Sequence, residues 1–553
     1  MEEFFMYSVF QQTKKFNKIK TPDAVTFANE CSFTVMKVFC IENIKKDGKY
    51  VIKSVIDKSK EFTFIKNDSI LTDEKYRLEI KENEAVVTAS CDKGLYRGAY
   101  ALAKILKSDE VFTGEIIDYP LFGVRGYIEG FYGKPWTAEE RVSVMRLAAK
   151  YGMNTYYYAP KDDVYHREKW NIPYPEKELK ELTELFLFAK ENYIDFYWCI
   201  GPGLSYEYSS DSDFCALYNK LLQLYEIGIR NFGLLFDDIP DILQHEADRE
   251  NFDDVVSAQT YLINRLYREL KEHDKSIRLT VCPTQYSGDT DSYYISKFGR
   301  SIPTDVDIFW TGEEICSRVL RSSDARDLIR STGHKPLYWD NYPVNDCEMF
   351  DRMHLDGIQG RDRDLYKYSA GFISNVMEYA ECTKIPLITI CDYLWNPYAY
   401  NKEKSTANAH KIILGEEKAE KFAYMADHLG VSCLTQYTSN RMSAMTHRVW
   451  DLYNSGNKPT ALEELKAYIE KMHKCSEMMH DKSVPLFREL DRWCQKYDMA
   501  FELMTCIYEM LARPGENEKK LLEDKLEQYN YTGVPLTGFC LRELANRALT
   551  VMY

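Results

Sequence analysis

Short apolar runs alternate with amphipathic segments through the middle of the chain, from about residue 118 to about residue 400. Runs of this length, bounded by polar or turn residues, are typical of buried strands in a parallel sheet. Eight strands are predicted on this basis: Val124–Ile128, Asn154–Tyr158, Ile194–Ile200, Phe232–Phe236, Ile277–Cys282, Val306–Trp310, Pro336–Trp339 and Gly371–Asn375, with the apolar run Ile385–Tyr393 behind the last. Eight strand-helix alternations match a closed (β/α)8 TIM barrel in number and length.

Helices are predicted between these strands. Thr137-Ala-Glu-Glu140 has the pattern of a capping box, which opens a helix running to Tyr151. Further helices are predicted at Pro175–Asn192, near Phe214–Ile227 and near Asp253–His273. Periodicity alone also fits an open, doubly wound sheet. No G-x-G-x-x-G follows the first strand, however, so the barrel is the preferred α/β fold for residues 118–400.

The two ends of the chain show different patterns. Residues 1–117 predict a small α/β domain, with one helix at Gly94–Lys107 and strands at Ser32–Ile41, Lys49–Ile56, Tyr76–Ile80 and Glu84–Ser90. Residues 401–553 predict a helical domain, with helices at Leu462–Met478, Val484–Tyr497, Met499–Leu511 and Glu518–Tyr529. No Gly/Ser-rich linker separates the three parts, so we expect them to pack closely.

Composition narrows the class of protein. The net charge of −15 argues against a surface that binds nucleic acid or an anionic membrane. No apolar run reaches the roughly 18 residues of a membrane span, and the acidic first residues do not resemble a signal peptide. The 15 cysteines are scattered without a C-x-x-C pair, which favours reduced thiols over disulfides or zinc. We therefore expect a cytoplasmic protein.

The stretch Asn231–Asp241, NFGLLFDDIPD, carries two adjacent carboxylates, Asp237 and Asp238, after an apolar run. The carboxyl end of a barrel strand is where TIM barrels place catalytic residues. Adjacent side chains diverge along a regular strand, so both can face one ligand only if the backbone leaves strand geometry there, which Pro240 favours. The alternative is a solvated turn, since Asp-Asp also occurs at 162–163 and 253–254.

Polar and aromatic residues follow the predicted ends of several other strands. They are Gly130, Lys161, Tyr286, Trp339, Asn341, Asp346 and Asn375. Each also has a structural explanation: Lys161 could pair with a neighbouring Asp, Asp346 could cap a helix, and the others could serve turns or packing. Together at one rim, amide, carboxylate and aromatic groups suit a neutral polyhydroxylated ligand.

Several long motifs resemble glycoside hydrolase family 84, the β-N-acetylglucosaminidases that include the protein O-GlcNAcases. They are GVRGYIEGFYGKPW at 123–136, YYYAPKDDVYHREKW at 156–170, LLFDDI at 234–239, CPTQY at 282–286, WDNYPVND at 339–346 and FISN at 372–375. They occur in the family's order over about residues 120–400. The flanking domains are similar to those of bacterial members, which have an N-terminal α/β domain and a C-terminal helical region.

The resemblance implies a retaining exo-β-N-acetylglucosaminidase in which the substrate's own acetamido oxygen attacks the anomeric carbon and forms an oxazoline. Asp237 would accept the acetamido N–H, and Asp238 would act as general acid and then general base. Tyr286 and Trp339 would form the acetamido pocket. The sugar hydroxyls would be held by Lys161, the Gly130 carbonyl, Asn341, Asp346 and Asn375. No metal or organic cofactor is implied.

The chain departs from the family pattern in three places, at Gly201-Pro-Gly-Leu-Ser205, Gln285 and Val376. None of these three differences removes a catalytic residue. Because they lie on the outer rim, the sequence does not define which aglycone the enzyme prefers. The expected partner is a GlcNAc-bearing glycoside or glycoprotein, in an oligomeric state that the sequence does not give. Two alternatives stay open: a hyaluronan or free-glycan hydrolase that uses the same site, and a catalytically silent GlcNAc-binding protein.

Overall fold

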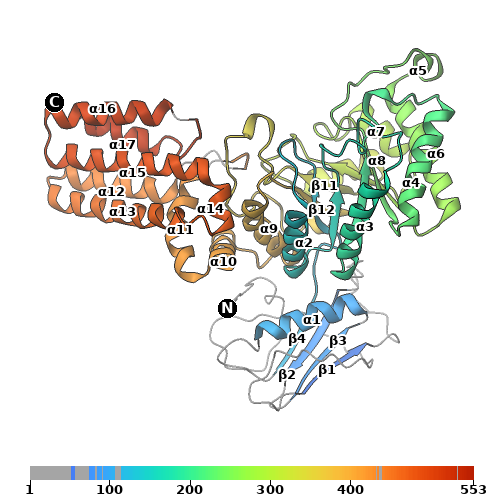
Figure 1. Ribbon diagram of the computed structural model, residues 1–553, viewed down its shortest axis with the longest axis horizontal. Coiled ribbons are helices and arrows are strands. Elements are labelled where there is room, and N and C mark those ends of the chain that lie inside the picture. The colour runs from blue at the N-terminus through green and yellow to red at the C-terminus, as the bar shows by residue number, and fades with distance from the viewer. Residues whose placement is uncertain are drawn as a thin grey trace.

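The computed structural model describes residues 51–56, 74–80, 84–89, 91–105, 114–430, 432–434, 439–531 and 533–552. The predicted strand Ser32–Ile41 lies outside the described residues. Three parts are visible in Figure 1: a small sheet near the N-terminus, a central barrel surrounded by helices, and a row of helices that leads to the C-terminus.

The central part is a closed barrel of eight parallel strands in the order β10-β11-β12-β5-β6-β7-β8-β9, which confirms the predicted fold. The strands are β5 (Arg125–Glu129), β6 (Thr155–Tyr158), β7 (Asp195–Ile200), β8 (Asn231–Leu235), β9 (Arg278–Cys282), β10 (Asp307–Trp310), β11 (Pro336–Asp340) and β12 (Gly371–Asn375). Closure is made by β12 and β5, where Ser374 pairs with Tyr127. Side chains such as Tyr157, Tyr197, Leu235, Phe309 and Ile373 form a separate buried cluster that fills the barrel.

Helices of 6 to 19 residues follow the strands and cover the barrel. They are α2 (Ala138–Lys150), α3 (Glu176–Glu191), α4 (Asp211–Glu226), α5 (Glu246–Asn251), α6 (Val255–His273), α7 (Tyr293–Arg300), α8 (Ser322–Thr332) and α9 (Ala380–Trp395). The capping box predicted at the start of α2 is confirmed, because Thr137 Oγ1 accepts from the Glu140 N–H and the Glu140 carboxylate accepts from the Thr137 N–H. The α9 helix is buried along almost its whole length and packs against both α2 and α10 (Lys402–Leu414).

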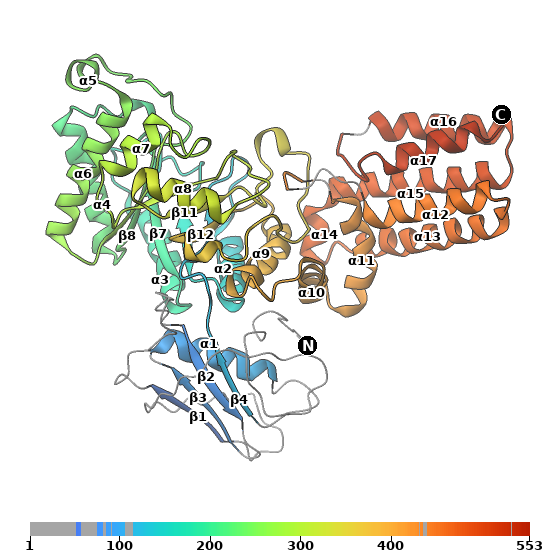
Figure 2. The same ribbon diagram turned by 180° about the vertical axis from the view of Figure 1, so that it is seen from behind.

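The N-terminal sheet has the strand order β1-β3-β2-β4, with β1 parallel to β3 and β2 antiparallel to both β3 and β4. Its strands are β1 (Val51–Ile56), β2 (Tyr76–Ile80), β3 (Glu84–Ala89) and β4 (Gly114–Asp118). The helix α1 (Asp92–Ile105) lies between this sheet and the barrel, as both ribbon views show (Figures 1 and 2).

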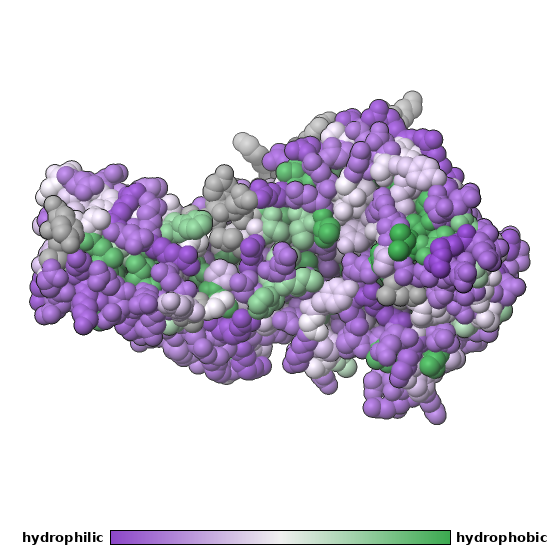
Figure 3. Space-filling model, turned by 90° about the horizontal axis from the view of Figure 1, so that it is seen from above, coloured by the Kyte–Doolittle hydropathy of each residue, from purple (hydrophilic) through white to green (hydrophobic). Residues whose placement is uncertain are grey.

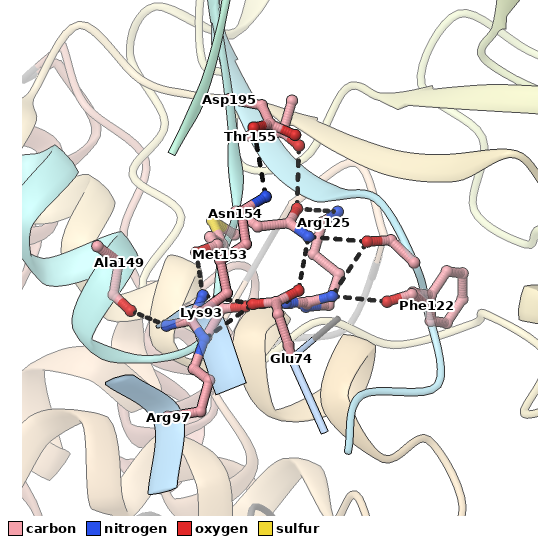
Figure 4. Close-up of polar contacts among 12 residues, drawn as sticks. Glu74, Lys93, Arg97, Phe122, Arg125, Ala149, Met153, Asn154, Thr155 and Asp195 are labelled. Carbon is pink, nitrogen blue, oxygen red and sulfur yellow. Dashed lines mark hydrogen bonds and ion pairs between the residues drawn. The ribbon is translucent and has the colours of Figure 1, made fainter. Parts of the chain in front are cut away.

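A buried ionic network joins the N-terminal part to the barrel (Figure 4). The Glu74 carboxylate accepts hydrogen bonds from Arg97 Nε at 2.8 Å, from an Arg125 terminal nitrogen at 2.6 Å and from Asn154 Nδ2 at 2.8 Å. Arg97 of α1 also donates to the Met153 carbonyl at 2.8 Å, and Arg125 of β5 donates to the Gly152 carbonyl at 2.8 Å. Burial alone would raise the pKa of Glu74, but the two guanidinium groups lower it to about 2.

Breaking this network is expected to destabilise the contact between the two parts. Glu74→Gln should lower the free energy of unfolding by about 3–5 kcal/mol, because it leaves two buried guanidinium groups without a counter-charge. In the unaltered chain, the stability that Glu74 contributes is complete above its ordinary pKa and is lost as the pH falls towards 2. Urea unfolding of the full chain measures both effects.

Glu79→Gln is the matched control on the same sheet. Its carboxylate pairs with Arg77 at 3.1 Å, but its side chain is 31% exposed, and such pairs contribute under about 1 kcal/mol. Equal losses in the two variants would show that burial of the Glu74 network has no energetic consequence.

The C-terminal part is helical, as predicted. Its helices are α10 (Lys402–Leu414), α11 (Glu416–His428), α12 (Asn440–Asn454), α13 (Lys458–Met479), α14 (Pro485–Glu489), α15 (Asp491–Ala512), α16 (Glu516–Tyr531) and α17 (Cys540–Leu549). None of the described helices is both long and apolar enough to cross a membrane. Seen from the side opposite the N-terminal sheet, the molecule is mainly hydrophilic, with hydrophobic residues gathered along these helices and over the barrel (Figure 3).

One helix boundary predicted for this part was wrong. The sequence predicted separate helices at Val484–Tyr497 and Met499–Leu511, but the structure has a short α14 and then one continuous α15. The apolar face of α15 runs without interruption through Trp493, Tyr497, Ala500 and Met504, all buried at helical spacing. Asp498 does not end the helix, because its side chain accepts a hydrogen bond from Ser476 of α13.

Candidate active site

A pocket of about 380 Å³ opens at the carboxyl ends of the barrel strands. All nine residues that the sequence singled out line it: Gly130, Lys161, Asp237, Asp238, Tyr286, Trp339, Asn341, Asp346 and Asn375. They come from the ends of six strands and are brought together because parallel strands deliver their carboxyl ends to one rim. Among the described residues, no group of three or more His, Cys, Asp or Glu side chains is arranged to hold a metal ion.

The Asp pair leaves strand geometry, as two adjacent side chains must if both are to face one pocket. The last residue of β8 is Leu235, and the Phe236 N–H still donates to the Cys282 carbonyl of β9 at 2.9 Å. Asp238 then has φ = 56°, in the left-handed region that non-glycine residues rarely adopt. The backbone changes direction at Asp238 itself, two residues before Pro240, and both carboxylates line the same pocket.

Asp237 is paired with a buried lysine. Lys161 Nζ donates to Asp237 Oδ2 at 2.9 Å, and the two side chains are only 8% and 11% exposed. Burial by itself would raise the pKa of Asp237, but the Lys161 ammonium outweighs burial through its charge and its hydrogen bond and lowers that pKa. Lys161 therefore contacts Asp237 rather than Asp162 or Asp163, and Asp237 is held in its ionised form.

Asp238 has neutral partners. The Tyr132 hydroxyl donates to Asp238 Oδ2 at 2.7 Å, and the Tyr286 hydroxyl lies 3.2 Å from Asp238 Oδ1. Burial first, and then the charge of Asp238, raise the pKa of Tyr286, so its phenol remains a hydrogen-bond donor. The two neighbouring carboxyl groups thus have opposite environments, one beside a buried cation and the other beside two hydroxyls.

The opposite wall of the pocket is a hydrogen-bonded set of side chains. Asn341 Oδ1 accepts from Trp339 Nε1 at 3.0 Å and from Asn375 Nδ2 at 2.9 Å. Asn375 Oδ1 is buried and has no hydrogen-bond partner among the residues that the structure describes, so it offers an acceptor to a ligand hydroxyl. Gly130 faces this wall, where a Cβ would lie 2.9 Å from Trp339 Cζ2. Only glycine fits there.

A family model described as beta-N-acetylglucosaminidase matches residues 125–427, which is more than half of the chain. The chain belongs to this family, glycoside hydrolase family 84. The protein O-GlcNAcases of rat and mouse are each 34% identical to it over 256 residues, or 45% of this chain. The match spans only 27% of the length of either relative.

Two solved structures are similar over most of the chain. A mutant of the Thermobaculum terrenum O-GlcNAc hydrolase is 29% identical, with a TM-score of 0.74 over 78% of this chain and 95% of that one. CpGH84B is also 29% identical, with a TM-score of 0.78 over 87% of each chain. Most of the family 84 architecture, including parts outside the barrel, is therefore shared.

Sequence reasoning missed two residues of this family 84 chain: Tyr132, which lines the pocket, and Arg167, which contacts Tyr132 but does not line the pocket. Tyr132 contacts Asp238, and Arg167 donates to the Tyr132 hydroxyl at 2.8 Å. Both lie inside the motifs that carried the resemblance, EGFYG and YHREKW. Their presence in those motifs was the available signal, but nothing in the sequence indicated that Tyr132 would contact Asp238 or that Arg167 would contact Tyr132.

Asp346 does not cap a helix, the alternative considered for it. It precedes the short 3-10 helix Cys347–Met349 but makes no side-chain cap hydrogen bond there. Instead Asp346 Oδ2 accepts from the Tyr132 N–H at 2.8 Å, across the mouth of the pocket. Burial raises the pKa of Asp346, and the Tyr132 N–H and the Lys161 charge oppose that shift.

Proposed function

We propose that this chain is a retaining exo-β-N-acetylglucosaminidase that removes terminal β-linked GlcNAc, including GlcNAc on protein hydroxyls, by substrate-assisted catalysis. The observation that carries this proposal is the asymmetry of the Asp pair. Asp237 is paired with the buried Lys161 ammonium, whereas the hydrogen bonds that Asp238 accepts from other described side chains come from tyrosine hydroxyls. The relatives named protein O-GlcNAcase and O-GlcNAc hydrolase support the substrate class.

The chemistry follows from that asymmetry. The ionised Asp237 accepts the acetamido N–H, which orients the acetamido oxygen towards C1 and stabilises positive charge as the glycosidic bond breaks. Asp238 gives its proton to the departing oxygen, and an oxazoline forms on the sugar. Asp238 then takes a proton from the water that opens the oxazoline, so the product keeps the β configuration.

The wall opposite the Asp pair would bind the sugar hydroxyls. Asn341, Asn375 and Asp346 supply amide and carboxylate groups there, and Trp339 supplies a flat apolar face beside Tyr286. A sugar without the acetamido group would lose its contacts with Asp237 and Tyr286 and would also lack the nucleophile. The proposal thus predicts strict selection for 2-acetamido sugars.

Two measurements on the purified full chain test the proposal. Proton NMR during hydrolysis of an aryl β-GlcNAc glycoside should show β-GlcNAc as the first product. Replacing the N-acetyl hydrogens of the substrate stepwise with fluorine should lower kcat/KM at each step, because fluorine weakens the acetamido oxygen as a nucleophile. An α product, or rates that do not respond to fluorination, would contradict participation by the acetamido group.

The same preparation separates the alternatives. Release of GlcNAc from a glycopeptide but not from hyaluronan fragments would support the proposed substrate class. The net charge of −15 also supports it, because a negatively charged protein disfavours binding of a polyanionic polymer. Hydrolysis confined to hyaluronan fragments would favour the free-glycan alternative. Binding without hydrolysis of any GlcNAc glycoside would leave a carbohydrate-binding protein.

Removing the cation beside Asp237 should change the pH dependence. In Lys161→Met, burial is no longer opposed by the ammonium, so the pKa of Asp237 rises. Activity requires the ionised carboxylate and is lost as the pH falls through that pKa, so the acidic limb of kcat/KM moves to higher pH. Lys335→Met, at an exposed position before β11, is the control and should leave the acidic limb in place. An acidic limb that does not move in Lys161→Met would contradict the prediction.

A further inference from the structure

The Tyr132 hydroxyl lies between a guanidinium group and the carboxylate of Asp238. Arg167 donates to the Tyr132 oxygen at 2.8 Å, and the Tyr132 hydroxyl donates to Asp238 Oδ2 at 2.7 Å. The three side chains come from different barrel loops, after β6, β5 and β8 respectively. They form a directed chain of hydrogen bonds that ends on one oxygen of the proposed acid/base.

We propose that Arg167 and Tyr132 are positioning residues that keep Oδ2 of Asp238 as a permanent hydrogen-bond acceptor, so that its catalytic proton enters and leaves at Oδ1. The inference rests on the proposed function of Asp238. It adds to that function two residues and the identity of the oxygen that carries the proton.

The direction of the chain follows from the chemistry of its first member. A guanidinium group has donors only and stays charged at every working pH. The Tyr132 oxygen must therefore be the acceptor in its hydrogen bond with Arg167. The single phenolic proton of Tyr132 then points away from Arg167, towards Asp238. A proton on Asp238 Oδ2 would face this phenolic proton at 2.7 Å, which excludes Oδ2 as its site.

Tyr132 is fixed from its backbone as well. Its N–H donates to Asp346 Oδ2 at 2.8 Å, and its ring lies over the Lys161 ammonium, 5.2 Å from Nζ to the ring centroid. The following residue, Gly133, has φ = 146°, where a Cβ would collide with the Glu378 carboxylate. These contacts hold the phenol in place although the side chain is partly exposed.

The other carboxylate oxygen is the available one. Tyr286 approaches Asp238 Oδ1 at 3.2 Å, the longer of the two contacts, and the proposed function assigns Tyr286 to the acetamido group of the substrate. In the first step the proton moves from Oδ1 to the glycosidic oxygen as the C1–O bond breaks. In the second step Oδ1 takes a proton from water, whose oxygen bonds to C1 as the oxazoline C1–O bond breaks.

Several other titratable or charged groups surround Asp238. They are Lys161 and Arg167 after β6, Asp237 beside it, Cys282 and Tyr286 at the end of β9, and Asp346 and Cys347 after β11. Of these groups and Tyr132, all within the described part of the chain, only the two tyrosines donate hydrogen bonds to the Asp238 carboxylate. The pH profile of variants at Tyr132 and Arg167 therefore reports on Oδ2, provided that the direct charge of Arg167 is separated from its action through the hydroxyl.

The test is the alkaline limb of the kcat/KM profile, which reports loss of the general acid from the free enzyme. Tyr132→Phe removes a donor that favours the ionised carboxylate, so the limb should move about one unit to higher pH. Arg167→Gln frees the phenol to rotate and should move the limb in the same direction by a smaller amount. Arg167→Lys keeps a charged donor and should restore most of the original position.

The double variant decides whether Arg167 acts through Tyr132. In the Tyr132→Phe background, Arg167→Gln should move the alkaline limb by less than half of its shift in the otherwise unaltered chain. Equal shifts in both backgrounds would mean that Arg167 acts by its charge alone and would overturn the proposal, as would an unmoved limb in Tyr132→Phe. Retained binding of a GlcNAc-derived oxazoline mimic shows that each variant is folded.

The unaltered chain separates this inference from the function on which it rests. Failure of the unaltered chain to hydrolyse an aryl β-GlcNAc glycoside would overturn both. Normal hydrolysis by the unaltered chain, with limbs that do not respond to either substitution, would overturn only the roles of Arg167 and Tyr132.

Discussion

Asp238→Asn is expected to lower kcat/KM for an unactivated alkyl GlcNAc glycoside by about 10³-fold, the usual contribution of a positioned general acid. An activated aryl glycoside should lose far less in the bond-breaking step, because its leaving group departs without protonation. The ratio of the two losses isolates the acid role, and burst kinetics on the aryl substrate show whether opening of the oxazoline has become rate-limiting.

Asp253→Asn is the matched control for this prediction. It makes the same substitution in another Asp-Asp pair, at an exposed position before α6 that does not line the pocket. Both substrates should be hydrolysed by it at unaltered rates. Equal losses on the alkyl and aryl glycosides in Asp238→Asn would falsify its assignment as general acid and place its role in binding.

The barrel could be predicted from the sequence because its strands are buried on both faces. The run Gly371–Asn375, which is buried at every position, was predicted with both of its ends correct. Where one face of an element meets solvent, prediction depended on periodicity and was weaker. The helices α10 and α11 carry few large apolar residues among their lysines and glutamates, and neither was predicted.

The pocket could be predicted less completely than the fold. The predicted strand ends indicated which residues reach the rim of the barrel. All nine candidates chosen in this way line one pocket. Which side chains contact each other depends on loop conformation, and periodicity carries no information about that. Lys161 had acidic neighbours in sequence but pairs with Asp237, and Tyr132 and Arg167 emerged only from the folded chain. The left-handed φ of Asp238 is a further local feature that no pattern of apolar residues encodes.

The asymmetry of the Asp pair also limits how the two residues can substitute for each other. Asp237 lies in a buried ion pair whose cation lowers its pKa, so it cannot carry a proton near neutral pH. Asp238 accepts hydrogen bonds from two tyrosine hydroxyls and, within the part of the chain that the structure describes, from no cation. In the proposed function, a single loop thus supplies one carboxylate for charge stabilisation and one carboxyl for proton transfer, as two-carboxyl mechanisms require.

Asp237→Ala is expected to lower kcat by about 10²–10³-fold on every substrate, whatever the leaving group. The acetamido N–H must be held while the oxazoline forms and while it opens, so an activated aryl glycoside gains nothing from its easier departure. The signature is a loss of the same size on alkyl and aryl glycosides, in contrast to the unequal losses expected for Asp238→Asn. Steady-state kcat on the two substrates, measured side by side, gives the comparison.

A structural explanation of that loss must be separated from the catalytic one. Asp237→Ala leaves the Lys161 ammonium buried without its partner, which costs about 3–5 kcal/mol of folding stability by itself. The double variant Asp237→Ala with Lys161→Met removes the unpaired charge and should recover most of that stability in urea unfolding. It should not recover kcat, because the carboxylate that holds the acetamido group is still absent. Recovery of kcat together with stability would mean that Asp237 serves only to neutralise Lys161.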